Sequence, residues 1–286
     1  MAVEQTTLLE ELVPAEGLLV QERDEEARDV LLRLAEDVEE YVDRNCPTTE
    51  DVQWFSFPTI FERLCYRRVE DDPRELRDVG EPLDRLYADL ALADVRLGEY
   101  DHAIEALKQA VRWNPMECGY RLDLAELFLL NGDVRECLGL TYSVFERASD
   151  ARHLVRAYVT FAGWFERSGN SRAAAAALRA ARRLDMRDAS LEAALDQAKG
   201  TPRDPDTLTD DEAAEALAAE GLPDGANAEV AICLLMCASD AAQAGERDVA
   251  TNLTVRARDL VGEPAAMALM RLIREGDDEG GEAHAG

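Results

Sequence analysis

A glycine-centred turn that recurs at a nearly constant interval constrains the fold of this 286-residue chain more than any other feature. Gly98-Glu99-Tyr100-Asp101 is followed 34 residues later by Gly132-Asp133-Val134-Arg135, and Gly169-Asn170-Ser171-Arg172 follows after another 37 residues. Glycine relieves the steric cost of the left-handed backbone that ends a helix. A period of roughly 20–50 residues is typical of repeat architectures, so we expect stacked units in the middle of the chain.

Apolar residues on both sides of each turn recur every three or four positions, which is the spacing of one face of a helix. Small residues recur among them, where two helices have to approach closely. No strand-like alternation stands out anywhere, so the pattern predicts three helix–turn–helix units in an all-α fold. The apolar positions before the turns include Leu86, Leu90, Ala91, Leu122, Ala125, Tyr158 and Ala162, and those after the turns include Ala103, Leu107, Cys137, Val144, Ala174 and Leu178.

The first of these units resembles the tetratricopeptide repeat (TPR) family. The resemblance rests on Tyr87-x-x-Leu90-Ala91, Gly98-x-Tyr100-x-x-Ala103, Leu107, Ala110 and Pro115. The second and third units are degenerate, because Cys137 replaces the small alanine and no proline closes either unit. The resemblance implies 34-residue antiparallel helix pairs that stack into a right-handed superhelix, with three units and a capping helix over residues 83–199.

The flanks of the repeats predict further helices. Residues 1–82 are expected to form an acidic helical cap, 200–208 a linker, 209–275 a helical region with a fourth TPR-like unit around Gly245, and 276–286 a disordered acidic tail. Five clustered aromatic residues in the first flank are expected to be buried contacts of the cap, and the alternative is that they anchor a partner. They are Trp54, Phe55, Phe57, Phe61 and Tyr66.

The charge of the chain argues against several classes of partner. The net charge is −29, with 23 acidic and 9 basic residues in 1–82 and 21 acidic and 7 basic residues in 189–286. Such a surface repels phosphate backbones, so we expect no nucleic-acid partner. No apolar run approaches the roughly 20 residues of a membrane span, and the N-terminus lacks the pattern of a secretory signal. Together with six scattered cysteines, these features predict a cytoplasmic protein with no membrane partner.

Candidate catalytic and metal-binding residues are few. His102, His153 and His284 are the only histidines, and we expect all three to be surface residues. Cys233 and Cys237 have a spacing on a predicted helix that a metal site could use, but packing in the core is the simpler interpretation. We therefore expect no enzyme, no catalytic residue, no metal and no cofactor, and a metalloenzyme built on the cysteine pair is the minor alternative.

The TPR resemblance implies a concave groove lined by the first helix of each unit. An apolar groove suits a hydrophobic peptide or helix, so we expect a non-catalytic adaptor or scaffold that holds a protein partner. The alternative is a self-associating structural protein that could form a homo-oligomer. Its groove would be filled by its own flanking helices. The groove residues that the resemblance implies are Arg85, Ala88, Leu92, Val95, Leu122, Glu126, Leu129, Arg156, Val159, Gly163 and Glu166.

A basic stripe follows the second helix of the third unit. Arg172, Arg179, Arg183 and Arg187 recur at seven- and four-residue spacing on one face, and such a stripe is usually solvated. Alternatively, it docks an acidic segment, either the protein's own tail or a second copy, and salt would weaken that contact.

Overall fold

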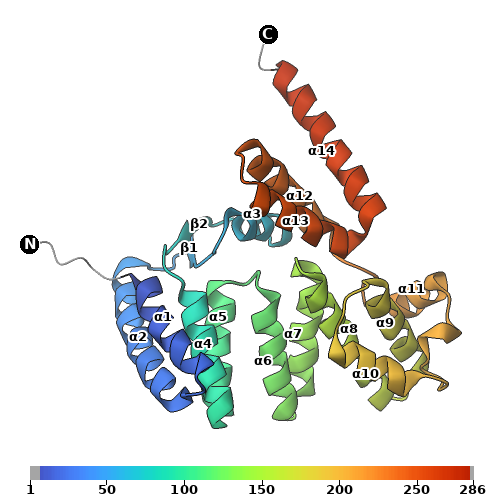
Figure 1. Cartoon of the computed structure of the whole chain (residues 1–286), viewed down its shortest axis with the longest axis horizontal. Coiled ribbons are helices and arrows are strands. Elements are labelled where there is room, and N and C mark those ends of the chain that lie inside the picture. The colour runs from blue at the N-terminus through green and yellow to red at the C-terminus, as the bar shows by residue number, and fades with distance from the viewer. Residues whose placement is uncertain (1–6, 284–286) are drawn as a thin grey trace, which may run out of the picture. The chain divides into compact units, whose positions relative to one another are not determined.

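The computed structural model describes the backbone of residues 7–283 and the side chains of residues 7–273 (Figure 1). Helices make up nearly all of the regular secondary structure of these residues, which confirms the predicted all-α class. The chain divides into two compact units, residues 1–137 and residues 138–286, which are described separately below as the first and the second unit. No helix in the described part is both long enough and apolar enough to cross a membrane.

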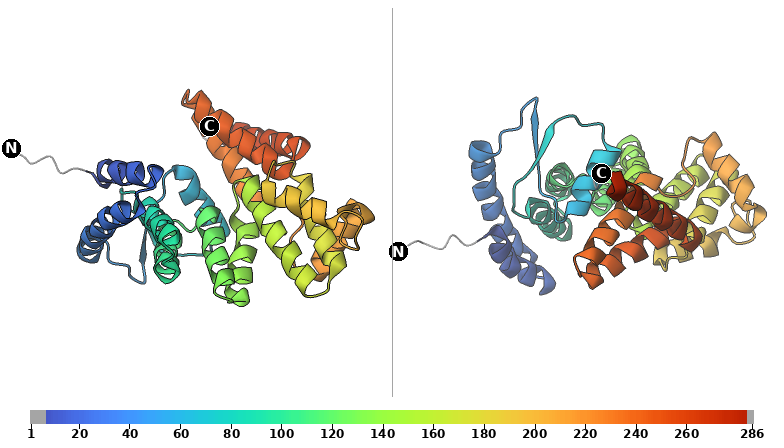
Figure 2. Two further views of the ribbon diagram at one scale, coloured as in Figure 1. Left: turned by 60° about the horizontal axis from the view of Figure 1, so that its bottom comes forward. Right: turned by 90° about the horizontal axis from the view of Figure 1, so that it is seen from above.

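In the first unit, successive helices form a row in which each helix packs on the next. Helix α1 packs on α2, α2 on α4, α4 on α5, and α5 on α6 (Figure 1). Figure 2 shows the same row from two further directions. Contacts that run from each element to its neighbour are the rule in repeat proteins. The helices are α1 (Leu8–Val20), α2 (Asp24–Asn45), α4 (Leu83–Leu97), α5 (Tyr100–Trp113) and α6 (Cys118–Leu130).

Helices flank all four glycine turns. Gly98, Gly132, Gly169 and Gly245 have φ angles of 80°, 82°, 80° and 83°. At Gly98, the amide of Glu99 donates to the Asp94 carbonyl (2.8 Å) and the amide of Gly98 donates to the Val95 carbonyl (3.1 Å). This is the Schellman motif, in which these two amides satisfy carbonyl groups in the last turn of the helix. The other flanking helices are α7 (Val134–Arg147), α8 (Ala151–Arg167), α9 (Ser171–Arg183), α12 (Ala228–Gln243) and α13 (Arg247–Val261).

A fifth turn of the same kind joins α1 to α2, although the sequence predicts no repeat turn in residues 1–82. Its left-handed residue is Glu22, with a φ of 58°. The amide of Arg23 donates to the Leu18 carbonyl (3.0 Å) and that of Glu22 to the Leu19 carbonyl (3.1 Å). The turn is hidden from sequence inspection because a glutamate occupies the position that glycine holds in the other four.

Replacing Glu22 with glycine is expected to raise the free energy of unfolding by about 1 kcal/mol. A β-carbon in the left-handed region costs about 1–2 kcal/mol, and the greater chain entropy of unfolded glycine offsets part of the gain. Urea denaturation followed by circular dichroism measures the change. Glu25→Gly, in the first turn of α2, is the control and should lower stability by about 1 kcal/mol. A loss of stability in both variants would contradict the role assigned to Glu22.

A small β–α–β segment lies between α2 and α4. It consists of β1 (Val52–Phe55), α3 (Ile60–Val69) and β2 (Glu75–Asp78), and the two strands pair in parallel, with Val52 opposite Glu75. This corrects the expectation that the chain has no strand: each strand has four residues, too few for alternation to stand out. Of the five clustered aromatic residues, four are buried as expected and Trp54 is half-buried.

In the second unit, helix α9 is the centre of the packing. It contacts α8, α10, η1 and α11, while α12 packs on α13 and both contact α14. The alanines at 173–177 of α9 are all buried, and their small side chains let neighbouring helices approach closely. Helix α14 continues through residues 276–283, part of the segment 276–286 that was expected to be a disordered tail. The remaining elements are α10 (Ala189–Ala198), η1 (Pro205–Thr207), α11 (Asp210–Ala219) and α14 (Glu263–Ala283).

Candidate functional site

The groove residues predicted on α4 lie on a face that borders α1. Arg85 forms an ion pair with Glu16 of α1, and Arg96 donates to the Leu19 carbonyl (2.7 Å) at the end of α1. Leu92 lies between these two arginines on the same helical face, and 40% of it is exposed. The N-terminal flank therefore lies along the edge of this face and leaves Leu92 accessible.

The other predicted groove residues of the first unit differ in exposure. Ala88, Val95 and Leu129 are half-buried, and Glu126 is exposed. Leu122 is only 2% exposed, so it belongs to the core of the unit and presents no surface to a ligand.

In the second unit, one predicted groove residue is engaged by the chain itself. Glu166 accepts a hydrogen bond from Arg203 Nη1 (2.6 Å), which lies in the segment between α10 and α11. Arg156, Val159 and Gly163 are half-buried on the same helix, α8.

Helix α1 carries an exposed apolar stripe that the sequence did not single out. Leu9, Val13 and Val20 are exposed to 46%, 58% and 85%, and their spacing places them on one face; we call them the outer stripe of α1. The residues that α1 buries are Leu8, Leu12, Ala15 and Leu19. The apolar arc of α1 is thus wider than the side that the helix buries, and Glu16 lies on the same face as the outer stripe. The outer stripe is therefore a candidate contact surface.

The basic stripe on α9 is bound to an acidic segment of the same chain. Arg179 Nε donates to Asp210 (2.6 Å) and Arg183 pairs with Asp224. Arg182, which the sequence did not include in the stripe, donates to Asp206 (2.8 Å). The partner segment is thus residues 206–224 of the second unit. Arg172, at the start of α9, is exposed. Arg187 is exposed too but does not belong to the stripe, because α9 ends at Arg183 and Asp185 takes a left-handed backbone (φ 52°).

A buried polar network surrounds Asp84 at the start of α4, where only 4% of the residue is exposed. Its carboxylate accepts hydrogen bonds from Ser56 Oγ (3.2 Å), Asn114 Nδ2 (3.0 Å) and the Tyr120 hydroxyl (3.4 Å). Burial raises the pKa of Asp84, and the hydrogen bonds oppose that rise. The network ties the end of β1 to α4, α5 and α6, and no motif in the sequence indicates it.

A second acidic group lies near the contact between α1 and α4. Burial raises the pKa of Asp89 to about 6, the neighbouring Glu16 adds to the rise, and Arg85 opposes it. Oδ2 of Asp89 is buried and has no hydrogen-bond partner among the described residues. Charge on Asp89 is therefore unfavourable in the folded protein at neutral pH.

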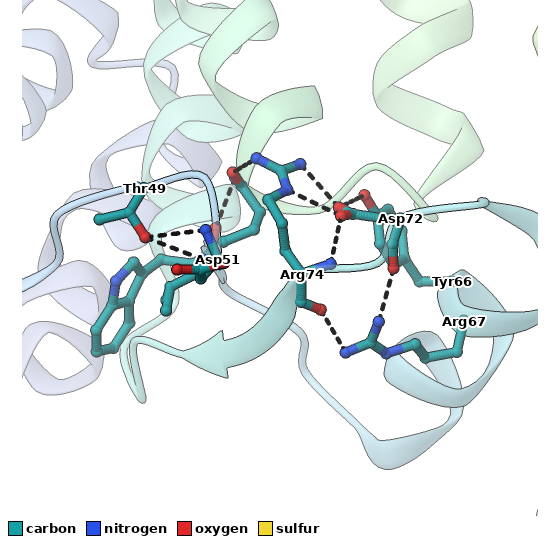
Figure 3. Close-up of polar contacts among 9 residues, drawn as sticks. Thr49, Asp51, Tyr66, Arg67, Asp72 and Arg74 are labelled. Atoms are coloured by element: carbon teal, nitrogen blue, oxygen red, sulfur yellow. Dashed lines mark hydrogen bonds and ion pairs between the residues drawn. The ribbon is translucent and has the colours of Figure 1, made fainter.

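Polar contacts also order the loop before β2 (Figure 3). Arg74 donates two hydrogen bonds to the Asp72 carboxylate (2.7 and 2.8 Å), and the Tyr66 hydroxyl donates a third (2.8 Å). Arg67 donates to the carbonyls of Asp72 (2.7 Å) and Arg74 (2.6 Å). The Arg74 guanidinium holds the pKa of Asp72 well below its usual range, and burial raises that of Tyr66. Each of these groups is paired within the loop, so the cluster stabilises structure.

The cysteine and histidine residues that were candidates for metal binding or catalysis do not form a common site among the described residues. Cys233 and Cys237 are buried on α12, as core packing predicts. Within the described residues, no three His, Cys, Asp or Glu side chains are grouped so that they could hold a metal ion. His102 is exposed and His153 is half-buried, while His284 lies outside the described residues. The absence of catalysis, a metal and a cofactor stays a prediction.

Comparison with known proteins gives neither a matching protein-family model nor a matching curated protein. The relation to the TPR family stays a prediction, and it rests on the first helix–turn–helix repeat, between Tyr87 and Pro115.

Proposed function

We propose that this protein is a cytoplasmic, non-catalytic adaptor built from TPR-like helix hairpins, and that it binds a peptide or helix of a partner protein. The observation that carries the proposal is the apolar surface formed by the outer stripe of α1, next to the α4 face that exposes Leu92. Soluble proteins rarely leave aligned aliphatic side chains open to water without a binding role. An amphipathic helix docked in an apolar groove would cover them.

The size of this surface predicts a reversible complex. Full burial of an aliphatic side chain contributes about 1.5–3 kcal/mol to the free energy of binding. The side chains of this surface are Leu9, Val13, Val20 and Leu92, and each is already partly covered. Weighted by their exposed fractions, their combined contribution is about 3–7 kcal/mol, from which the entropy cost of association is subtracted. Acidic residues around the surface would set the orientation of the partner and the rate of encounter.

Affinity capture from native lysate, followed by mass spectrometry, tests the proposal. Leu92→Glu and Val13→Glu, each checked for cooperative melting, are expected to lose a protein that the parent captures. Ile60→Glu is the matched control, because Ile60 is an exposed aliphatic residue on α3, away from this surface. Capture of the same proteins by all four baits would contradict the proposed surface.

A self-associating structural protein is the second candidate function. Two contacts favour it, because the chain's own segments engage groove residues: Glu16 pairs with Arg85 in the first unit, and Arg203 pairs with Glu166 in the second. Sedimentation velocity over a wide concentration range distinguishes the two functions. A mass fixed at one subunit would exclude self-association.

A further inference from the structure

The first unit has a cleft between α2, α4 and α5 with a volume of about 380 Å³. Its apolar lining comes from Leu32 and Ala35 of α2, Leu90 of α4 and Ala106 of α5. The α4 residues of this cleft lie on the helix face opposite Leu92 and Arg96. The cleft is therefore separate from the surface in the proposed function.

The polar lining of this cleft is predominantly acidic. Four carboxylates face one arginine, and that arginine, Arg28, already donates to Asp94 (2.5 Å). Glu105 is paired with Lys108 (2.6 Å). Glu36 and Glu39 remain, and neither has a cationic partner among the described side chains.

The two uncompensated glutamates are well placed to receive a cation. They are three residues apart on α2, so they are neighbours on one face of the helix. Glu39 accepts a hydrogen bond from the Tyr87 hydroxyl (3.3 Å), which keeps its carboxylate at the cleft. A lysine or arginine can lay its aliphatic stem on apolar surface while its charged end stays in a polar setting.

We propose that this cleft binds a basic amphipathic segment of a partner protein, with one lysine or arginine side chain inserted between the apolar lining and the carboxylates of Glu36 and Glu39. Charge complementarity selects a basic segment, and the apolar lining selects one that also carries aliphatic residues.

The charge of the chain favours a different protein over a second copy as the occupant. The net charge of −29 makes two copies repel one another. Arg179, Arg182 and Arg183, in the arginine-rich part of the chain, are already paired with aspartates of the second unit. A basic partner would supply a cation for Glu36 and Glu39, which none of the described side chains of this protein does.

Fluorescence anisotropy tests the inference on the full-length protein. The probe is a fluorescein-labelled helical peptide of alanine, leucine and arginine, with leucine and arginine placed four positions apart. The parent protein is expected to bind it, and Glu36→Gln/Glu39→Gln to bind it about tenfold more weakly. Glu26→Gln/Asp37→Asn is the matched control, because both residues are exposed and lie on a face of α2 turned away from Glu36 and Glu39, so the same charge is removed outside the cleft. It should bind the probe like the parent.

A second measurement locates the bound peptide. His102 lies at the rim of the cleft, and 62% of its side chain is exposed. Bound probe should slow its modification by diethylpyrocarbonate, measured by mass spectrometry, while that of His153 stays unchanged. Three results would each overturn the inference: no binding, equal weakening in both double variants, or equal binding of a peptide with serine in place of leucine. The surface on α1 is tested separately by Leu92→Glu, which should leave probe binding unchanged.

Discussion

Replacing Asp84 with alanine is expected to lower the free energy of unfolding by about 3 kcal/mol. The substitution removes the acceptor of Asn114 and Tyr120, while Ser56 Oγ keeps the Glu81 carbonyl as its nearer acceptor (2.7 Å). A buried donor left without a partner costs about 1–3 kcal/mol. The smaller alanine side chain also leaves a small cavity. Because relaxation recovers part of this loss, the expected total lies in the lower half of the range of about 2–6 kcal/mol summed over the two orphaned donors. Urea denaturation at neutral pH measures it.

Two further variants separate the network from a general effect of lost charge. Asp37→Ala removes an exposed carboxylate from α2 and should change stability by less than about 0.5 kcal/mol. A double-mutant cycle of Asp84→Ala with Asn114→Ala should give a coupling energy of about 1 kcal/mol or more, because the second deletion removes one of the orphaned donors. Strict additivity would show that the Asp84–Asn114 hydrogen bond contributes nothing.

Replacing Asp89 with asparagine is expected to stabilise the protein at pH 7 by about 2 kcal/mol. The pKa of Asp89 rises from an ordinary value near 3.8 to about 6 on folding, so the folded state binds more protons than the unfolded state between these pH values. The contribution of Asp89 to stability is therefore highest below about pH 4 and is lost as the pH rises through 6. One pKa unit corresponds to about 1.4 kcal/mol, reduced here by partial exposure.

The difference in unfolding free energy between the parent and Asp89→Asn isolates this group from the other titrating residues. It should be near zero at pH 3.5, grow between pH 4 and 6, and stay constant above that range. Asp29→Asn, an exposed carboxylate on α2, should show no such dependence. An Asp89→Asn variant that is less stable than the parent at pH 7 would show that Asp89 is favourably ionised in the fold.

These two predictions both concern carboxylates on α4. Asp84 is fully paired inside the unit, whereas Asp89 lies beside Glu16 of α1 with one oxygen unpaired. Repulsion between Asp89 and Glu16 weakens the contact between α1 and α4, and Arg85 opposes it. The N-terminal flank is therefore held against α4 by a balance of charges that pH can change.

Local pattern was sufficient to place the hairpins of this protein. Periodic apolar residues around Gly98, Gly132, Gly169 and Gly245 predicted helices on both sides of each turn, because helical periodicity and a left-handed glycine are properties of a few neighbouring residues. The same reasoning missed the turn at Glu22, where contacts of α1 and α2 hold a glutamate in a backbone that its β-carbon disfavours.

The sequence by itself determined the all-α class, the positions of four turns and the acidic character of both flanks. Only the tertiary structure brought Asp84 to Ser56 and Asn114, the α9 arginines to residues 206–224, and Glu36 and Glu39 to the cleft on α4 and α5. These groups are separated by about 25 to 70 positions along the chain. Their meeting depends on which helix faces pack together, and periodicity within one helix carries no information about that choice.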